Sequence, residues 1–231
     1  MQTIDTQRRI GATPVGAILI VESLLLFVPV FVLGVAIDWP ASLSQPAATV
    51  LPLIAARGPA VTLGYFSYLV YSILFFPMAF LLSAYVEGGT IRSAVGQIAV
   101  GFAALSTLAR SIGIARWLTA MPLLAQRWAE QPGREIEIAY DSLNAFAGGL
   151  GESVGVGLFA GIWVAGASWS MLRQRRLPAW VGWFGVVSAV AVAVPIVEFF
   201  GVEIGGVISV TTSVVHLWWL ACGIVLLARR Q

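Results

Sequence analysis

The sequence predicts an all-α polytopic membrane protein, a single domain of 231 residues with six transmembrane helices in one bundle. Three observations predict this class. Hydrophobic residues make up 59% of the chain and charged residues only 10%, whereas soluble domains average about 25% charged residues. Mean hydropathy is +0.91. Several apolar stretches reach the roughly 20 residues that a helix needs to cross a bilayer.

The first three spans are expected at about 14–37, 59–85 and 91–117. The first ends before Pro40, because proline cannot continue a helix. In the loop that follows, "AATVLPLIAARG" is a candidate for a segment on the membrane surface. The second span starts at Pro59, a residue tolerated in a first turn, and Pro77 predicts a kink inside it.

The apolar pattern of the third span continues through "RWLTAMPLLAQRW", which makes it too long for one straight transmembrane helix. We expect the span to end near Arg116 or Trp117, and the remainder to form a separate helix along the membrane interface. Trp117, Arg127 and Trp128 are typical interfacial anchors. The next stretch, "AEQPGREIEIAYD", is the most polar of the chain and is predicted to lie in water.

The last three spans are expected at about 141–172, 179–200 and 205–228. The fourth is glycine-rich, with "SLNAFAGGLGESVGVGLFAGIWVAG", and "RQRRLP" ends it. In the fifth, Pro195 removes an intrahelical hydrogen bond and leaves a carbonyl near Ala191 without its donor. Broken helices of this kind line transporter sites, although prolines are frequent in membrane helices generally.

The arginine distribution predicts the orientation. Six spans place both termini on one side, and this side collects eight arginines: Arg8, Arg9, Arg92, Arg173, Arg175, Arg176, Arg229 and Arg230. The opposite side collects three: Arg57, Arg127 and Arg134. By the positive-inside rule, both termini are cytoplasmic. All 13 basic residues are arginine, which is typical of GC-rich bacterial genomes, so the predicted location is the bacterial inner membrane.

Five ionisable residues inside the predicted spans form the primary candidate site. Each costs about 2.5–3.5 kcal/mol at mid-membrane, so such residues usually pair or line a cavity. At about 1.5 Å per residue, Glu22, Glu152 and His216 fall near the midplane, and Arg110 and Glu198 in the outer third. Opposite charges in hydrocarbon should meet, so any of the three carboxylates is an expected partner of Arg110.

Other polar residues are secondary candidates. Tyr65, Tyr68 and Tyr71 recur every three residues on roughly one face of the second span, in its outer half. Asn144 opens the fourth span near the same level, and Arg116 lies close to the outer surface, from which its side chain can lean inward. These groups are candidates to line a cavity open to the outside, although tyrosines are also common at membrane interfaces.

The glycines around Glu152 predict close helix packing. The pairs Gly151–Gly155 and Gly157–Gly161 have the small-xxx-small spacing that lets two helix backbones approach closely. A neighbouring helix can then bring its polar groups to the carboxylate of Glu152. The same glycines also allow an oligomer to form through this helix.

The sequence offers little support for a metal or cofactor. One histidine, His216, excludes a bis-histidine haem, and no motif supports a His/Met haem. A zinc site made by His216 and two carboxylates lacks any HExxH-like spacing. Nucleophilic triads, phosphate-binding loops and dinucleotide fingerprints are absent. Cys222 is the single cysteine, and a net charge of +2 is too small to indicate nucleic-acid binding. We therefore expect no cofactor and no metal.

Three stretches, "ARWLTAMPLLAQRWAE", "AYDSLNAFAGGLGESVGVGLFAGIWVAG" and "LPAWVGWFGVVSAV", resemble an uncharacterised bacterial family of six-helix integral membrane proteins, catalogued as a domain of unknown function. The resemblance covers about 106–194 and is weaker over the first two spans. Its motifs fall on Arg110 and Arg116, on Gly151 and Glu152, and on the start of the fifth span: Leu177, Pro178 and Trp180. The resemblance implies the architecture and no activity.

Three functions stay open from the sequence. The first is a protein that binds or transports a small or lipid-like ligand in a polar cavity open to the outer face. The second is an intramembrane acid–base enzyme acting on a lipid or isoprenoid, with Glu152 or Glu198 as acid, His216 as base and Arg110 holding an anionic group. The third is a structural or regulatory subunit locked by buried ion pairs. Membrane lipids are the expected partners.

Overall fold

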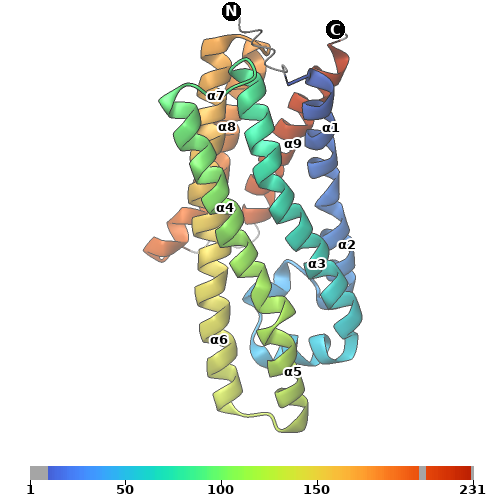
Figure 1. Cartoon of the computed structure of the whole chain (residues 1–231). Coiled ribbons are helices and arrows are strands. Elements are labelled where there is room, and N and C mark those ends of the chain that lie inside the picture. The colour runs from blue at the N-terminus through green and yellow to red at the C-terminus, as the bar shows by residue number, and fades with distance from the viewer. Residues whose placement is uncertain (1–9, 203–206, 230–231) are drawn as a thin grey trace, which may run out of the picture.

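The computed structural model describes residues 10–202 and 207–229, and within these ranges every regular element is helical. Six segments are long and apolar enough to cross a membrane, which confirms the predicted class. They are Ala12–Ile37, Ala47–Val86, Ala94–Glu130, Arg134–Gln174, Ala179–Phe200 and Val210–Ala228. Figure 1 shows them as one elongated bundle.

The first span consists of two helices, α1 (Ala12–Leu25) and α2 (Phe27–Ile37). It ends where predicted, because Asp38 adopts a left-handed conformation with φ of 57° and Pro40 follows. A short 3-10 helix, η1 (Ala41–Ser44), leads to the next span.

The second span, α3 (Ala47–Val86), starts earlier than predicted. The segment expected on a membrane surface forms its first turns, and Arg57 is the one residue of α3 with non-helical backbone angles. The break therefore falls just before Pro59, whose ring disrupts the preceding turn, and not at Pro77. The guanidinium of Arg57 donates to the carbonyl of Val35 at the end of α2, which fixes the break against that helix.

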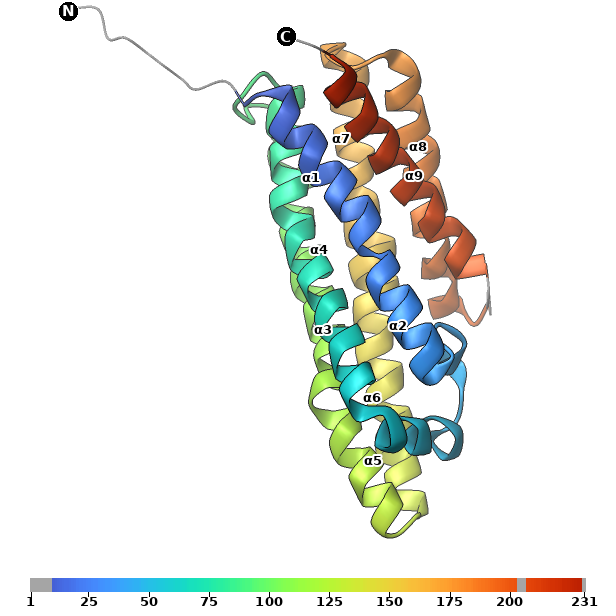
Figure 2. The same cartoon turned by 90° about the vertical axis from the view of Figure 1, so that its right-hand side faces the viewer.

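The third span breaks near the predicted position. Helix α4 (Ala94–Leu118) ends at Thr119, and α5 (Ala120–Glu130) follows. Contrary to the prediction of a helix lying across the bundle at an interface, α5 continues along the bundle axis and forms a hairpin with α6 (Arg134–Gly148) (Figures 1 and 2). The reason is that its apolar face, with Met121 and Ala125, is buried against helices of the same chain.

The fourth span therefore starts before the predicted residue 141, with α6. It continues through a π-helical stretch, η2 (Gly149–Ala160), into α7 (Gly161–Gln174). The fifth span is α8 (Ala179–Ala193) followed by a 3-10 helix, η3 (Val194–Phe200).

The helix tightens at Pro195 as η3 begins, and the amide of Val194 donates to the carbonyl of Ala191. The carbonyl predicted to lack a donor thus has one. The sixth span is α9 (Val207–Ala228); its predicted start at Gly205 lies outside the described residues.

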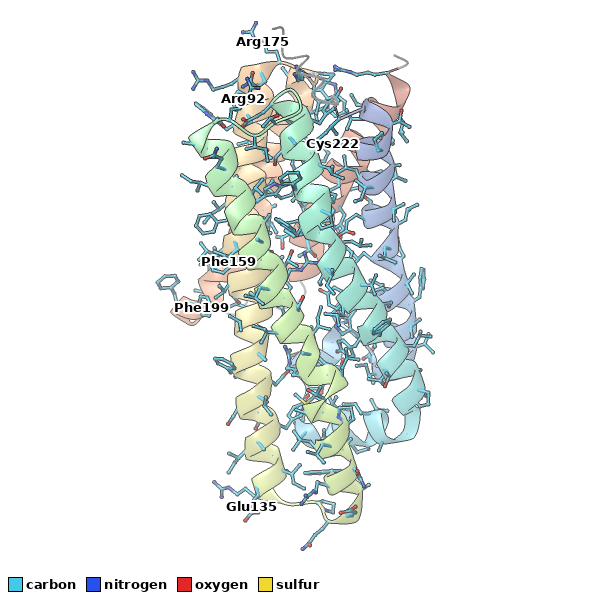
Figure 3. All side chains as sticks on the ribbon, in the orientation of Figure 1. Arg92, Glu135, Phe159, Arg175, Phe199 and Cys222 are labelled. Atoms are coloured by element: carbon cyan, nitrogen blue, oxygen red, sulfur yellow. The ribbon has the colours of Figure 1, made fainter. Side chains whose placement is uncertain are left out.

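The first turn of α1 and the last turn of α9 lie at the same end of the bundle, with the turns that follow α3 and α7 (Figures 1 and 2). Figure 3 shows Arg92 and Arg175 at this end and Glu135 at the opposite end. Arg229 donates to the carbonyl of Arg176 there. Arg8, Arg9 and Arg230 lie outside the described residues. We call this end the arginine-rich end.

Two hydrophobic clusters fill the bundle. The first includes Leu19 of α1, Phe75 of α3 and Trp163 of α7. The second includes Leu33 of α2 and Trp117 of α4, and it extends into α5 and α6. The long helix α3 contributes to both clusters, and the candidate site lies where they meet.

Candidate functional site

Glycines bring η2 against α4, as the spacing around Glu152 predicted. A Cβ on Gly113 of α4 would lie 2.9 Å from the Cα of Gly151, and a Cβ on Gly155 would lie 3.1 Å from Cγ of Arg110. Only glycine permits this approach. It places the arginines of α4 beside Glu152, so α4 is the neighbouring helix that the sequence could not name.

The second glycine pair of this span faces the other way. A Cβ on Gly157 would lie 3.2 Å from Cγ1 of Ile196 in η3, and one on Gly161 would lie 3.5 Å from Cγ1 of Val192 in α8. Both pairs thus contact helices of the same chain. The oligomer expected through this helix stays a prediction.

A cavity of about 130 Å³ lies between α3, α4, η2 and α9. Its walls combine residues of both hydrophobic clusters with polar side chains. The polar and aromatic ones are Trp39, Tyr65, Tyr68, Tyr71, Phe75, Arg110, Arg116, Trp117, Glu152, Thr212, His216 and Trp219. The cavity therefore contains two of the predicted arginines, one predicted carboxylate and the histidine.

One wall of the cavity is a continuous row of aromatic rings. Trp39 contacts Tyr68 edge-on at 5.8 Å between ring centroids, and Tyr68 stacks on Tyr71 at 5.7 Å. Tyr71 stacks on His216 at 5.9 Å, and His216 meets Trp219 edge-on at 4.8 Å. The three-residue spacing of the tyrosines predicted part of this row. Trp219 was not predicted from the sequence, although it lies one helical turn after His216.

His216 is held by two hydrogen bonds of opposite kind. Its Nδ1 lies 2.7 Å from the carbonyl oxygen of Thr212, and its Nε2 lies 2.6 Å from the hydroxyl of Tyr71. A carbonyl only accepts, so Nδ1 carries the proton. In the neutral ring, Nε2 then accepts from Tyr71. This arrangement defines the tautomer and connects α9 to α3.

Arg110 does not pair with a carboxylate, contrary to the sequence-based expectation. Its guanidinium lies over the ring of Tyr71, with 4.8 Å from Cζ to the centroid, and over the ring of Phe75 at 5.1 Å. The side chain is 5% exposed. Arginine stacks on aromatic rings through cation–π attraction, and the ring row at the cavity supplies these faces.

Arg116 is the partner of Glu152. Its Nη2 lies 3.7 Å from Oε1 of Glu152, within ion-pair distance. Arg116 also donates to the carbonyl of Gly113 at 2.8 Å and to the amide oxygen of Asn144 at 3.2 Å. Asn144 in turn donates to the carbonyl of Leu43 at 2.7 Å. Arg116 and Asn144, which the sequence indicated only as secondary candidates, are thus central to the polar side of the site.

Four buried polar atoms of the cavity lining have no hydrogen-bond partner in the described part of the protein. They are Nε of Arg110, Nε of Arg116, the hydroxyl of Tyr65 and Nε1 of Trp219. Tyr65 stacks on Trp117 at 4.8 Å between centroids, so its ring position is fixed. Unsatisfied buried polar groups are rare in native proteins and call for an explanation. Here four of them belong to residues that line one cavity.

A second, more open hollow of about 290 Å³ adjoins the cavity. It shares Leu43, Arg116 and Glu152 with the cavity, and it is also lined by Asn144 and Glu198. The side chain of Glu152 is 37% exposed. Glu198 is exposed and lines this hollow, not the cavity.

Glu22 of α1 is fully buried, with 0% exposure, and does not line the cavity. Neither of its carboxylate oxygens has a hydrogen-bond partner within the described residues. The structure thus keeps Glu22 out of the cavity lining, although its carboxylate lies within electrostatic reach of Arg110. Over the described residues, no three histidine, cysteine or acidic side chains gather as a metal site.

These features define a six-helix integral membrane protein with a polar, aromatic-lined cavity inside its bundle. The chain belongs to the family described as Domain of unknown function (DUF4386), which matches residues 15–229. The resemblance found in the sequence is thereby confirmed, and it extends over both of the first two spans. No curated protein and no solved structure matches the chain.

Proposed function

We propose that the protein binds a small or lipid-like ligand in the cavity between α3, α4, η2 and α9, and that it presents or transports this ligand. One observation carries the proposal: four residues that line one cavity of about 130 Å³ each carry a buried polar atom without a hydrogen-bond partner among the described residues. A cavity of about 150 Å³ accepts benzene, so a compact ligand group fits here. A bound ligand would supply the missing hydrogen bonds.

We further propose that the cavity opens to the outer face and that the arginine-rich end is cytoplasmic, in a bacterial inner membrane. His216 lies roughly 18 Å along α9 from its arginine-rich end, and Glu152 roughly 30 Å along its span from Gln174. Hydrocarbon is about 30 Å thick, so the site occupies the outer half of the span. Reporter enzymes fused after Gln231 test the orientation, and periplasmic activity of such a fusion would contradict it.

Native mass spectrometry of the gently extracted protein, combined with lipidomics of what co-purifies, tests the binding function. The variants are Glu152→Gln, which alters the polar entrance, and Ala160→Phe, which fills the cavity from η2. Ala104→Phe, on an exposed face of α4, is the matched control. We expect wild type and the control to retain one specific molecule that Ala160→Phe lacks. Equal retention by all three would contradict binding in the cavity.

An acid–base enzyme is the second candidate, and the short contact from Tyr71 to His216 favours it. A hydroxyl and an imidazole within 2.6 Å, beside a cavity, are suited to proton transfer. His216→Asn tests this candidate. For an enzyme, the variant should accumulate a different molecule from the one that wild type retains, separable by chromatography. An identical molecule in both favours binding without chemistry.

If no molecule is retained and Glu152→Gln only lowers the melting temperature, the protein is better described as a structural subunit. The pair of Arg116 and Glu152 would then act as an internal brace.

A further inference from the structure

The unpartnered polar atoms of the residues that line the cavity are mostly hydrogen-bond donors. Arginine Nε–H and tryptophan Nε1–H groups donate and cannot accept. Three of the four unpartnered atoms are therefore pure donors, on Arg110, Arg116 and Trp219. The fourth, the hydroxyl of Tyr65, can also donate. A ligand that satisfies this wall must present acceptor oxygens to it.

The two arginines differ in how their charges are compensated. Arg116 has the carboxylate of Glu152 at 3.7 Å and an acceptor on each side, from Gly113 and Asn144. Arg110 makes no ion pair with any described residue, and its guanidinium rests on two aromatic rings. A buried charge is costly unless it is paired. Arg110 is thus the buried cation of the cavity without a carboxylate partner.

Glu22 lies near enough to Arg110 for the two charges to attract, but it is not in contact with the guanidinium. It makes no ion pair with Arg110 in the described structure, and it lies outside the cavity lining. Glu152 forms its ion pair with Arg116. A carboxylate brought in by a ligand would meet Arg110 with the planar two-oxygen geometry that guanidinium groups recognise.

The remainder of the lining is apolar. Phe75, Ile114, Val156 and Ala160 contribute the walls beside Arg110, and they favour a hydrocarbon or ring body. On the basis of the ligand-binding function above, we propose that the cavity binds an amphipathic carboxylic acid in its anionic form. Arg110 binds the carboxylate, Trp219 and Tyr65 donate to ligand oxygens, and the aromatic row encloses the apolar body.

Isothermal titration calorimetry on the purified full chain tests the ligand class with three probes of similar size. Benzoate carries the carboxylate, whereas benzamide and benzyl alcohol keep the ring and are neutral. The variant is Arg110→Gln, and Arg127→Gln is its control, because Arg127 is exposed on α5 away from the cavity. We expect wild type and the control to bind benzoate at least tenfold more tightly than benzamide. Arg110→Gln should lose this preference and still bind benzyl alcohol with unchanged affinity.

The outcomes separate the ligand class from the binding function. Neutral probes that bind wild type as tightly as benzoate would overturn the anionic class and leave the cavity a binding site. If Arg110→Gln still binds benzoate tenfold more tightly than benzamide, another residue binds the carboxylate of the ligand. If none of the three probes binds wild type, both proposals fail.

Discussion

The hydroxyl of Tyr71 lies 2.6 Å from Nε2 of His216 and thereby joins α3 to α9 at the cavity wall. Because Nδ1 of the same ring faces the carbonyl of Thr212, the imidazole is fixed on both sides. A rotation of the imidazole would break at least one of these hydrogen bonds, so the contact between Tyr71 and His216 is a sensitive probe of the site.

Tyr71→Phe should lower the free energy of unfolding by about 0.6 kcal/mol, the average for hydrogen bonds between membrane helices, and by at most about 1.7 kcal/mol. The ring contacts with Tyr68 and His216 remain, so the loss reports on the hydroxyl alone. A double-mutant cycle with His216→Phe, followed by thermal unfolding in detergent, measures the coupling. Tyr68→Phe is the control. A coupling energy of zero would show that the hydrogen bond contributes nothing.

Gly113→Ala should destabilise the protein by about 1–3 kcal/mol, because the added methyl overpacks a fixed backbone contact. Its Cβ would lie 2.9 Å from both the carbonyl oxygen of Ala147 and the Cα of Gly151. Gly101→Ala on the same helix is the matched control, since its Cβ meets nothing within 4 Å. That change should be neutral or gain up to about 1 kcal/mol from helix propensity. Equal melting temperatures of the two variants would contradict the tight contact of α4 with η2.

Glu152→Gln should cost less than about 1 kcal/mol, because partly exposed ion pairs contribute little. Arg116→Gln should cost more, about 1.5–3 kcal/mol, because it also removes the charged donor to Gly113 and Asn144. Thermal melts of both variants, measured side by side, test the order. If Glu152→Gln proved the more damaging, the ion pair would be a structural brace, as the third functional hypothesis holds.

Glu22→Leu should raise the melting temperature. The carboxyl group is fully buried and both of its oxygens lack partners in the described structure, so removing it removes a desolvation cost of about 1–3 kcal/mol. Leucine fills nearly the same volume. Glu22→Gln, which keeps a polar group at the position, should give little of this gain. A destabilised Glu22→Leu variant would indicate that the acid has a partner when the protein works.

Glu87, in the turn between α3 and α4, should make stability depend on pH. Burial alone would raise the pKa of this carboxyl, but donation from the hydroxyl of Ser93 and from the amides of Ser93 and Arg92 outweighs burial and lowers the pKa from its ordinary value of 4.5. A group whose pKa is lowered by folding stabilises the protein above its ordinary value, and this contribution disappears as pH falls through the folded value.

The test is a series of melting temperatures from neutral pH to below pH 4.5. Wild type should lose more stability over this range than Glu87→Gln. Ser93 also caps α4 by accepting from the amide of Gly96 at 2.9 Å, so Ser93→Ala should lower stability at every pH and flatten the same slope. Parallel curves for wild type and Glu87→Gln would rule out this role.

The sequence predicted the number of spans and most of their ends. A span is indicated by the length of an apolar stretch, and a helix end by the local steric effect of proline. It also predicted that glycines would bring a helix to Glu152. It did not identify which arginine arrives there, since Arg110 and Arg116 lie on the same helix and their selection depends on its rotation. Membrane helices are apolar toward both lipid and core, so the periodicity that indicates rotation in soluble proteins is weak.

Two other differences share a physical cause. The direction of α5 and the placement of Glu22 outside the cavity depend on how separate helices pack, and no local pattern specifies that. The stacking of Arg110 on Tyr71 and Phe75 was likewise missed because carboxylates were assumed to be the better partners. Aromatic faces compete well for guanidinium groups where water is scarce.

The cavity lies at the seam between two hydrophobic clusters that share α3 and α4. Side chains at this seam can rearrange while the packing within each cluster is kept, whereas motion inside either cluster would break close-packed contacts. The two ends of the bundle are joined across the seam by the continuous helices α3 and α4, and the side chains of the cavity lie between their two cores. A molecule bound there would contact both clusters at once and so couple the packing of one end of the bundle to that of the other.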